Sequence, residues 1–496
     1  MEPGIIGLCL LVAVFLYFYN NPLKHNRWFM VRRFINWFPL GMTYAFLYMG
    51  RYNLNVAKNA LGAAMSKEDF GLIFGAGTVT YALSFLINGP LVDKKLGGKN
   101  GIMVAAIGAA LANIALGGLT YLMAMHRLKI NMVLAFSAVY AVNMYFQSYG
   151  AVSIIKVKSY WFHVRERGVF GAIFGTLISV GAYFAFDWGQ AIVNMTKATT
   201  TGKLGWFHAL LQRAFVPPAK PVDATWAVFF VPAAILIFWA LVDLWLIKDT
   251  PEEADFAHFD TCDASSGQMH VELTTRDLLK KVFMSPLMLM LAAVELTSGV
   301  LRNGVYQWYP IFAKEVVQPG ASYFSDHWGF LLCVFGIIGG FTGGLISDKF
   351  FQSRRGPPVA LLCGFMFLMT ILIAVNLFAS PVVVAWGAVF IAMAVIGVTS
   401  LVSGTAATDF GGRKATGTCS GIIDGCAYLG TGIQSFSLGF LTGHSWYWWP
   451  IFLSPFALIG CVIAVKIWHE LPAATKRYIA EVELERAPAA EPELVS

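Results

Sequence analysis

The sequence predicts an all-α membrane protein in which twelve spans form two six-helix bundles related by a pseudo-twofold axis. Of the 496 residues, 57% are hydrophobic and only 13% are charged, and the mean hydropathy is +0.64, far outside the composition of soluble globular proteins. Apolar stretches also recur along the chain, each near the roughly 20 residues that a helix needs to cross a bilayer. We therefore expect the chain to reside in the lipid bilayer and to function as a monomer.

A polar segment at 248–283, which we interpret as a cytoplasmic linker, separates the spans into two groups of six. The predicted spans are 34–61, 69–90, 99–124, 131–158, 169–194, 223–247, 284–316, 325–349, 358–379, 381–404, 416–441 and 445–469. They give an N-terminal bundle at 34–247 and a C-terminal bundle at 284–469. The tail at 470–496 is poor in large apolar residues and is predicted to be disordered.

An additional apolar segment, 4–19, lies within the region 1–33 that precedes the first span. A secretory signal peptide is one interpretation, but the segment lacks a basic leading region and a clear small-residue cleavage site. We favour an uncleaved extra helix, short for a full span, followed by a basic stretch on the cytoplasmic side.

Lysines and arginines gather in four short connections, all on one predicted side of the membrane. These connections contain Lys94, Lys95, Lys99, Arg165, Arg167, Lys349, Arg354, Arg355, Arg413 and Lys414. By the positive-inside tendency this side is cytoplasmic, and a multi-pass protein of the bacterial inner membrane is the expected location. The net charge of +7 is scattered over loops, so no nucleic-acid partner is expected. The seven cysteines form no Cys-x-x-Cys pair, and neither a metal nor a cofactor is predicted.

Matching landmarks recur in the two halves. Gly89 and Asp93 close the second span before Lys94, and Gly344 and Asp348 close the eighth before Lys349. Asp93 and Asp348 stand 255 positions apart (348 − 93), and the arginines of the first and seventh spans, Arg51 and Arg302, stand 251 apart (302 − 51). Arg167 and Arg413, at the starts of the fifth and eleventh spans, share a similar offset. These charge clusters at helix ends are suited to hold the halves together in one state and to release them in another.

With this repeated Gly-x-x-x-Asp-basic signature the sequence resembles the major facilitator superfamily. The resemblance implies two rocking bundles around a central cavity, and it gives Gly89, Asp93, Lys94, Arg167, Asp348, Lys349 and Arg413 a role in gating.

Arg51 and Arg302 each lie deep within a predicted span. At the bilayer centre each costs about 2.5–3.5 kcal/mol on insertion scales, so retaining both indicates a polar cavity and a function. A guanidinium presents a fixed fork of donors that matches two phosphate oxygens, and two facing forks can hold a dianion. The alternative is that each arginine pairs with a buried carboxylate. Tyr44 and Tyr48 share the helical face of Arg51, and Tyr306 shares that of Arg302.

The residues around these arginines resemble the organophosphate:inorganic phosphate antiporter family, which includes glycerol-3-phosphate and hexose-6-phosphate exchangers. The resemblance places the family's phosphate-binding arginines at Arg51 and Arg302 and two substrate-facing tyrosines at Tyr44 and Tyr48. It places Lys156 where glycerol-phosphate members carry arginine, with Tyr160 one turn further on. The sequence departs from those members at Phe85 and Ile178, where they carry lysine and histidine. Phosphate recognition is therefore better supported than any particular organic group.

Three acidic residues also lie within predicted spans: Asp187, Glu295 and Asp424. Each is a candidate proton site, which favours proton symport, or one half of an ion pair. For Glu295, two turns from Arg302, we favour the ion pair. Asp424 has no evident partner in the sequence.

The sequence thus favours a secondary transporter that exchanges a phosphorylated organic anion for inorganic phosphate by alternating access. Proton-coupled transport of another anion and a non-transporting sugar-phosphate receptor remain as alternatives. Because no nucleophile–base pair or metal constellation is present in the sequence, an enzyme is not expected.

Overall fold

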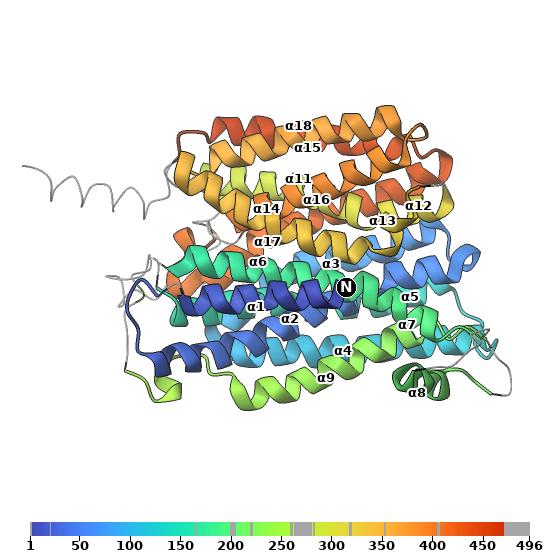
Figure 1. The fold of residues 1–496 in the computed structure, drawn as a ribbon, viewed down its shortest axis with the longest axis horizontal. Coiled ribbons are helices and arrows are strands. Elements are labelled where there is room, and N and C mark those ends of the chain that lie inside the picture. The colour runs from blue at the N-terminus through green and yellow to red at the C-terminus, as the bar shows by residue number, and fades with distance from the viewer. Residues whose placement is uncertain are drawn as a thin grey trace, which may run out of the picture.

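The computed structural model describes residues 2–19, 21–163, 166–198, 205–218, 222–257, 261, 280, 283–316, 320–351, 354–403 and 407–470. Every regular element in these ranges is helical, which confirms the all-α class. Figure 1 shows the long helices lying alongside one another, with the first half of the chain, in blue to green, below the second half, in yellow to red.

Each half supplies six long helical stretches within these ranges. The first half contains α2 (Arg27–Leu61), α3 (Lys67–Leu91), α4 (Gly97–Ala124), α5 (Met132–Trp161), α6 (Arg167–Tyr183) with its continuation α7 (Gly189–Met195), the short α8 (Trp206–Phe215) and α9 (Ala227–Leu246). The second half contains α11 (Pro286–Tyr306) with its continuation α12 (Trp308–Glu315), the short α13 (Ser322–Asp326), α14 (Trp328–Phe350), α15 (Gly356–Asn376), α16 (Pro381–Leu401), α17 (Ala407–His444) and α18 (Trp448–Lys466). We call the end where α9 finishes and α11 begins the linker end.

Five described helical stretches are long and apolar enough to cross a membrane: Lys67–Ala124, which joins α3 and α4, and then α9, α15, α16 and α18. Other long helices carry buried polar side chains. Examples are Arg51 in α2, Gln147 in α5 and Arg302 in α11. Polar groups at membrane depth are expected where spans line an interior site. Arg51 and Arg302 thus lie on helices outside the strictly apolar stretches, whereas α3, within them, contributes polar groups such as Tyr81.

The two halves pack together through α3 against α17, α6 against α14 and α5 against α17. Glycine permits the closest approach at the contact of α3 with α17. A Cβ atom on Gly71 would lie 2.5 Å from the carbonyl oxygen of Ser435 and 2.8 Å from the Cα atom of Gly439. The backbones therefore meet without intervening side chains, as is common where membrane helices pack tightly.

The additional N-terminal helix is present as α1 (Glu2–Tyr19), which packs on α6 and on α14 and so contacts both halves. Its last turn is anchored by Tyr17, whose hydroxyl donates to the carbonyl of Met30 at 2.8 Å and accepts from Nε of Arg33 at 2.9 Å. Arg33 also makes a bidentate ion pair with Glu166, both contacts at 2.9 Å. Burial would raise the pKa of Glu166, but hydrogen bonds from His25 and Arg33 outweigh it and lower the pKa to about 2.

Candidate functional site

Arg51 lies fully buried in α2, and neutral side chains from three other helices hold its guanidinium. Nε donates to the side-chain oxygen of Gln147 on α5 at 3.0 Å, and one terminal nitrogen donates to the hydroxyl of Tyr81 on α3 at 3.2 Å. The other terminal nitrogen donates to the hydroxyl of Tyr428 on α17. No carboxylate among the described residues forms an ion pair with Arg51, so its positive charge is fixed in place without being neutralised.

Arg302 on α11 is the second member of what we call the arginine pair, and it is held less completely. Its side chain is buried, yet Nε and one terminal nitrogen have no hydrogen-bond partner. Leaving a buried charged donor unsatisfied costs about 1–3 kcal/mol or more. Vacant donors of this kind in a membrane interior indicate a site that an anion can complete.

Tyr428 joins the two arginines. The guanidinium carbon of Arg51 lies 5.2 Å from the ring centroid of Tyr428, and that of Arg302 lies 5.4 Å from the same centroid. The structure thus brings Arg51 and Arg302 to one aromatic ring, as the shared sequence period suggested. Tyr428, Tyr81 and Gln147 were not identified as site residues from the sequence. Tyrosine and glutamine are common in spans, and only the helix packing brings these three to Arg51.

The predicted tyrosines surround the pair on the side of α2 and α11. The guanidinium carbon of Arg51 lies 4.7 Å from the ring centroid of Tyr48, and the rings of Tyr44 and Tyr48 meet edge to face at 5.4 Å. Tyr306 is buried, with its ring 6.3 Å from that of Tyr52. The interior is therefore an aromatic cage with hydroxyl groups, which suits cations through ring faces and phosphate oxygens through O–H donors.

Lys156 and Tyr160 lie towards the linker end rather than beside the arginine pair. Lys156 stands nine residues beyond Gln147 on α5, about 13 Å along the helix axis. Its ammonium forms an ion pair with Asp93 at 3.1 Å and lies 5.5 Å from the ring centroid of Tyr160. The structure therefore groups Lys156 with the predicted gating residues, and a direct role in substrate binding stays a prediction.

Asp93 joins the two halves at the linker end. One carboxylate oxygen pairs with Lys156, and the other accepts hydrogen bonds of 2.9 Å from both the backbone N–H and the hydroxyl of Thr418 on α17. Gly89 is buried in the same turn, whereas Lys94 is exposed. The side chains of Arg167, Asp348, Lys349 and Arg413 lie outside the described residues. The predicted gating charge of the first half is thus in contact with the second half.

Asp187 makes a corresponding contact near the opposite end. It lies in one π-helical turn, Phe184–Trp188, between α6 and α7. Its two carboxylate oxygens accept from the backbone N–H groups of Gly329 and Phe330 at 2.7 and 2.8 Å. These donors open α14, so the carboxylate satisfies free N–H groups and meets the positive end of the helix dipole. Lys67 and Glu315 add an ion pair of 2.9 Å between the halves at this end.

Glu295 and Asp424 differ in what surrounds their carboxylates. Asp424 accepts hydrogen bonds from the hydroxyls of Ser403 and Ser420. Both oxygens of Glu295 are buried without a hydrogen-bond partner, and the ion pair with Arg302 that the sequence favoured is not formed. Seven residues of helix separate the two by about 10 Å along the axis, which is too far for direct contact.

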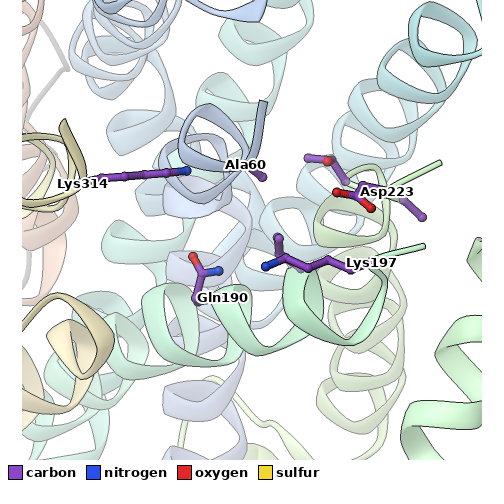
Figure 2. Close-up of a pocket in the computed structure, with 8 residues that line it drawn as sticks. Ala60, Gln190, Lys197, Asp223 and Lys314 are labelled. Carbon is purple, nitrogen blue, oxygen red and sulfur yellow. The ribbon is translucent and has the colours of Figure 1, made fainter. Parts of the chain in front are cut away.

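A cavity of about 160 Å³ opens at the end opposite the linker (Figure 2). Ala60 at the end of α2, Gln190 on α7 and Lys314 on α12 line it, together with Val193, Lys197, Asp223, Ala224 and Thr225. The two lysines outweigh the one carboxylate in this lining, Asp223, so the cavity is attractive to an anion that approaches this end of the protein. Ala60 stands nine residues beyond Arg51 on α2, so this cavity lies about 13 Å further along that helix.

Comparisons with known proteins agree with this architecture. The sequence profile of the Major Facilitator Superfamily matches residues 40–435. The chain is 22% identical to the membrane sensor protein UhpC of Escherichia coli, over 88% of this chain and 92% of that protein. It is 24% identical to the glycerol-3-phosphate transporter of Bacillus subtilis, over 86% of this chain and 90% of that protein. It is also 24% identical to a probable hexose phosphate transport protein of Chlamydia pneumoniae, over 92% of this chain and 93% of that protein.

Solved structures share the fold at low identity. A bacterial homologue of the human lysosomal transporter Spinster, inward-facing and unoccupied, superposes with a TM-score of 0.63 at 15% identity, covering 94% of this chain and 100% of that one. The E. coli fucose:proton symporter FucP gives a TM-score of 0.57 at 15% identity, covering 88% of this chain and 98% of that one. At such identities the likeness establishes the arrangement of helices and nothing about the cargo.

Proposed function

The chain belongs to the major facilitator superfamily, and from that premise we propose that it exchanges a phosphorylated organic anion for inorganic phosphate by alternating access. The observation that carries this proposal is the pair of vacant, buried donors on Arg302, beside the ring that also contacts Arg51. An anion with several oxygens can take up both donors while remaining near a second fixed positive charge. Phosphate and phosphate monoesters have that geometry, and a guanidinium binds them bidentately.

Alternating access has a physical basis in the contacts between halves. Asp93 with Thr418 closes the linker end, which we propose to be cytoplasmic, and Asp187 with α14 closes the opposite end. Between them, the hydroxyl of Tyr52 on α2 donates to Asn303 on α11 at 2.8 Å. Transport requires that one set of end contacts break while the other holds, and cargo contributes by its different contacts in the two states.

Counterflow in proteoliposomes tests the proposed exchange. Purified protein is reconstituted into vesicles preloaded with phosphate, and uptake of labelled glycerol-3-phosphate, hexose phosphates and phosphoglycerates is measured at one pH. We expect uptake of at least one of these compounds that depends on internal phosphate. Uptake that follows an imposed pH gradient and ignores internal phosphate would instead establish proton-coupled transport.

A receptor that binds without transporting is a second candidate, because one of the relatives is named a membrane sensor protein. The same vesicles separate the two functions. If the protein is a receptor, adding a sugar phosphate should protect it against thermal unfolding, yet the vesicles should show negligible counterflow. Phosphate-dependent counterflow well above that of empty vesicles excludes this candidate.

Replacing Asp187 by asparagine is expected to favour opening at the end opposite the linker. Asparagine keeps one acceptor oxygen, so one of the two N–H groups of α14 loses its partner and the helix dipole loses its counter-charge. Caps of this kind contribute about 0.5–2 kcal/mol, which corresponds to an increase of about 2- to 30-fold in the open population. Spin labels at the exposed positions Asn194 and Tyr323 should report longer distances. Asp326→Asn, an exposed acid nearby, should leave the distances unchanged.

A further inference from the structure

Glu295 is a buried carboxyl group that the arginine pair does not account for. The residue is 1% exposed, and neither carboxylate oxygen has a hydrogen-bond partner. An ionised carboxylate in such surroundings costs several kcal/mol, whereas a protonated one avoids most of that penalty. Asp243 on α9, also fully buried, has a hydroxyl donor in Thr43 at 2.6 Å. Glu295 thus differs from Asp243 and Asp424 in that neither of its oxygens accepts a hydrogen bond of normal length and angle, although the hydroxyl of Thr399 lies nearby.

The described groups that interact with Glu295 offer it no compensating charge close by. From its own helix it faces Arg302, about 10 Å away along the axis. From α17 it faces Asp424, a second acid, and Cys426, and from α15 it faces Cys363. On α16 its neighbour is the hydroxyl of Thr399. Among the described groups, Arg302 is distant and Asp424 opposes ionisation, so closure of the protein around Glu295 favours its neutral form.

We infer that Glu295 is a proton-binding site that must be filled for the two halves to close around the arginine pair. When the cavity is open and hydrated the carboxylate can ionise. On closure it takes a proton from cavity water, forming an O–H bond on one carboxylate oxygen, and the proton returns to water when either end opens. The inference builds on the proposed exchange by assigning a proton to each closed state.

Proton binding at Glu295 makes the rate of exchange fall as the pH rises. At a pH above the range in which Glu295 titrates in the open cavity, each further unit leaves ten times fewer molecules protonated and ready to close. Exchange therefore slows by up to tenfold per pH unit on that side. An anion near Arg302 repels the ionised carboxylate, so cargo and proton assist each other's binding reciprocally.

The test compares phosphate counterflow of the wild type, Glu295→Gln and Asp243→Asn between pH 5 and pH 9. Glutamine has the shape of the neutral acid and no proton to lose, so Glu295→Gln should retain exchange at high pH, where the wild type slows. Asp243→Asn is the matched control and should follow the wild-type profile. Each variant's rate is divided by the wild-type rate at the same pH. The effect of the titration of phosphate itself, which is the same for all proteins, then drops out of the comparison. Glu295→Met, neutral but without polar atoms, should give the same flat profile if glutamine impairs folding.

A second readout does not depend on transport. The thermal unfolding midpoint of Glu295→Gln should exceed that of the wild type by an amount that grows from pH 5 to pH 9, because the closed wild-type state loses stability as Glu295 gives up its proton and glutamine has no proton to lose. Parallel pH profiles for exchange and unfolding in the two proteins would overturn the inference, even if phosphate exchange itself is found. Absence of exchange in the wild type contradicts the proposed function, while the unfolding measurement still decides the proton site.

Discussion

Replacing either member of the arginine pair by lysine is expected to abolish phosphate-dependent counterflow. An ammonium keeps the charge but not the planar fork, so Arg302→Lys loses the two donors now free for an anion. Hydrogen bonds to charged groups contribute about 1.5–3 kcal/mol each, so the loss of two predicts at least a hundredfold fall in exchange. Arg51→Lys should have a similar effect, since one ammonium cannot reach Gln147, Tyr81 and Tyr428 together.

The control is Arg127→Lys, an exposed arginine in the connection after α4. It should exchange at the wild-type rate, and all three variants should reach the membrane in equal amounts. If Arg51→Lys and Arg302→Lys both exchange normally, the assignment of the phosphate site to this pair is wrong.

Asp93→Asn is expected to have the second largest effect, because it removes the carboxylate from a buried ion pair with Lys156. Lys156 is only 5% exposed, and its ion pair holds the carboxylate of Asp93 where it also accepts hydrogen bonds from Thr418 of the second half. Removing one partner of a buried pair costs about 3–5 kcal/mol. We therefore expect a lower thermal unfolding midpoint and a shift towards the state that is open at the linker end. Unfolding in detergent measures the first consequence, and thiol labelling of Cys419, buried beside Thr418 on α17, measures the second.

Two further variants separate charge burial from simple loss of contact. Asp93→Asn combined with Lys156→Met removes both charges and should recover much of the lost stability, because no unpaired ion remains. Glu315→Gln breaks the more exposed pair with Lys67 and should cost less than about 1 kcal/mol. An unfolding midpoint of Asp93→Asn equal to that of the wild type would show that this ion pair does not secure the linker end.

Helix packing changed the interpretation of several residues. Tyr428 is the residue that links Arg51 to Arg302, yet its spacing along α17 carries no signal, since a buried tyrosine is usual in an aromatic-rich span. Asp187 was a candidate proton site in the sequence, and the structure makes it the cap of a helix in the other half. Lys156 was placed beside the substrate by family resemblance, and the structure pairs it with Asp93. Each change depends on a partner more than 50 positions away.

Composition and residue spacing were enough to predict the membrane environment, the all-α class and the period that relates Arg51 to Arg302. These follow from composition and from local spacing, because the bilayer constrains every span to the same length and penalises every charge within it. Which of those charges have partners became evident from the packing of the helices. Whether Arg302 keeps vacant donors, or Glu295 lacks the expected ion pair, depends on which faces of α11, α16 and α17 meet. Helix packing selects those faces through close contacts between residues far apart in the chain, which local spacing does not specify.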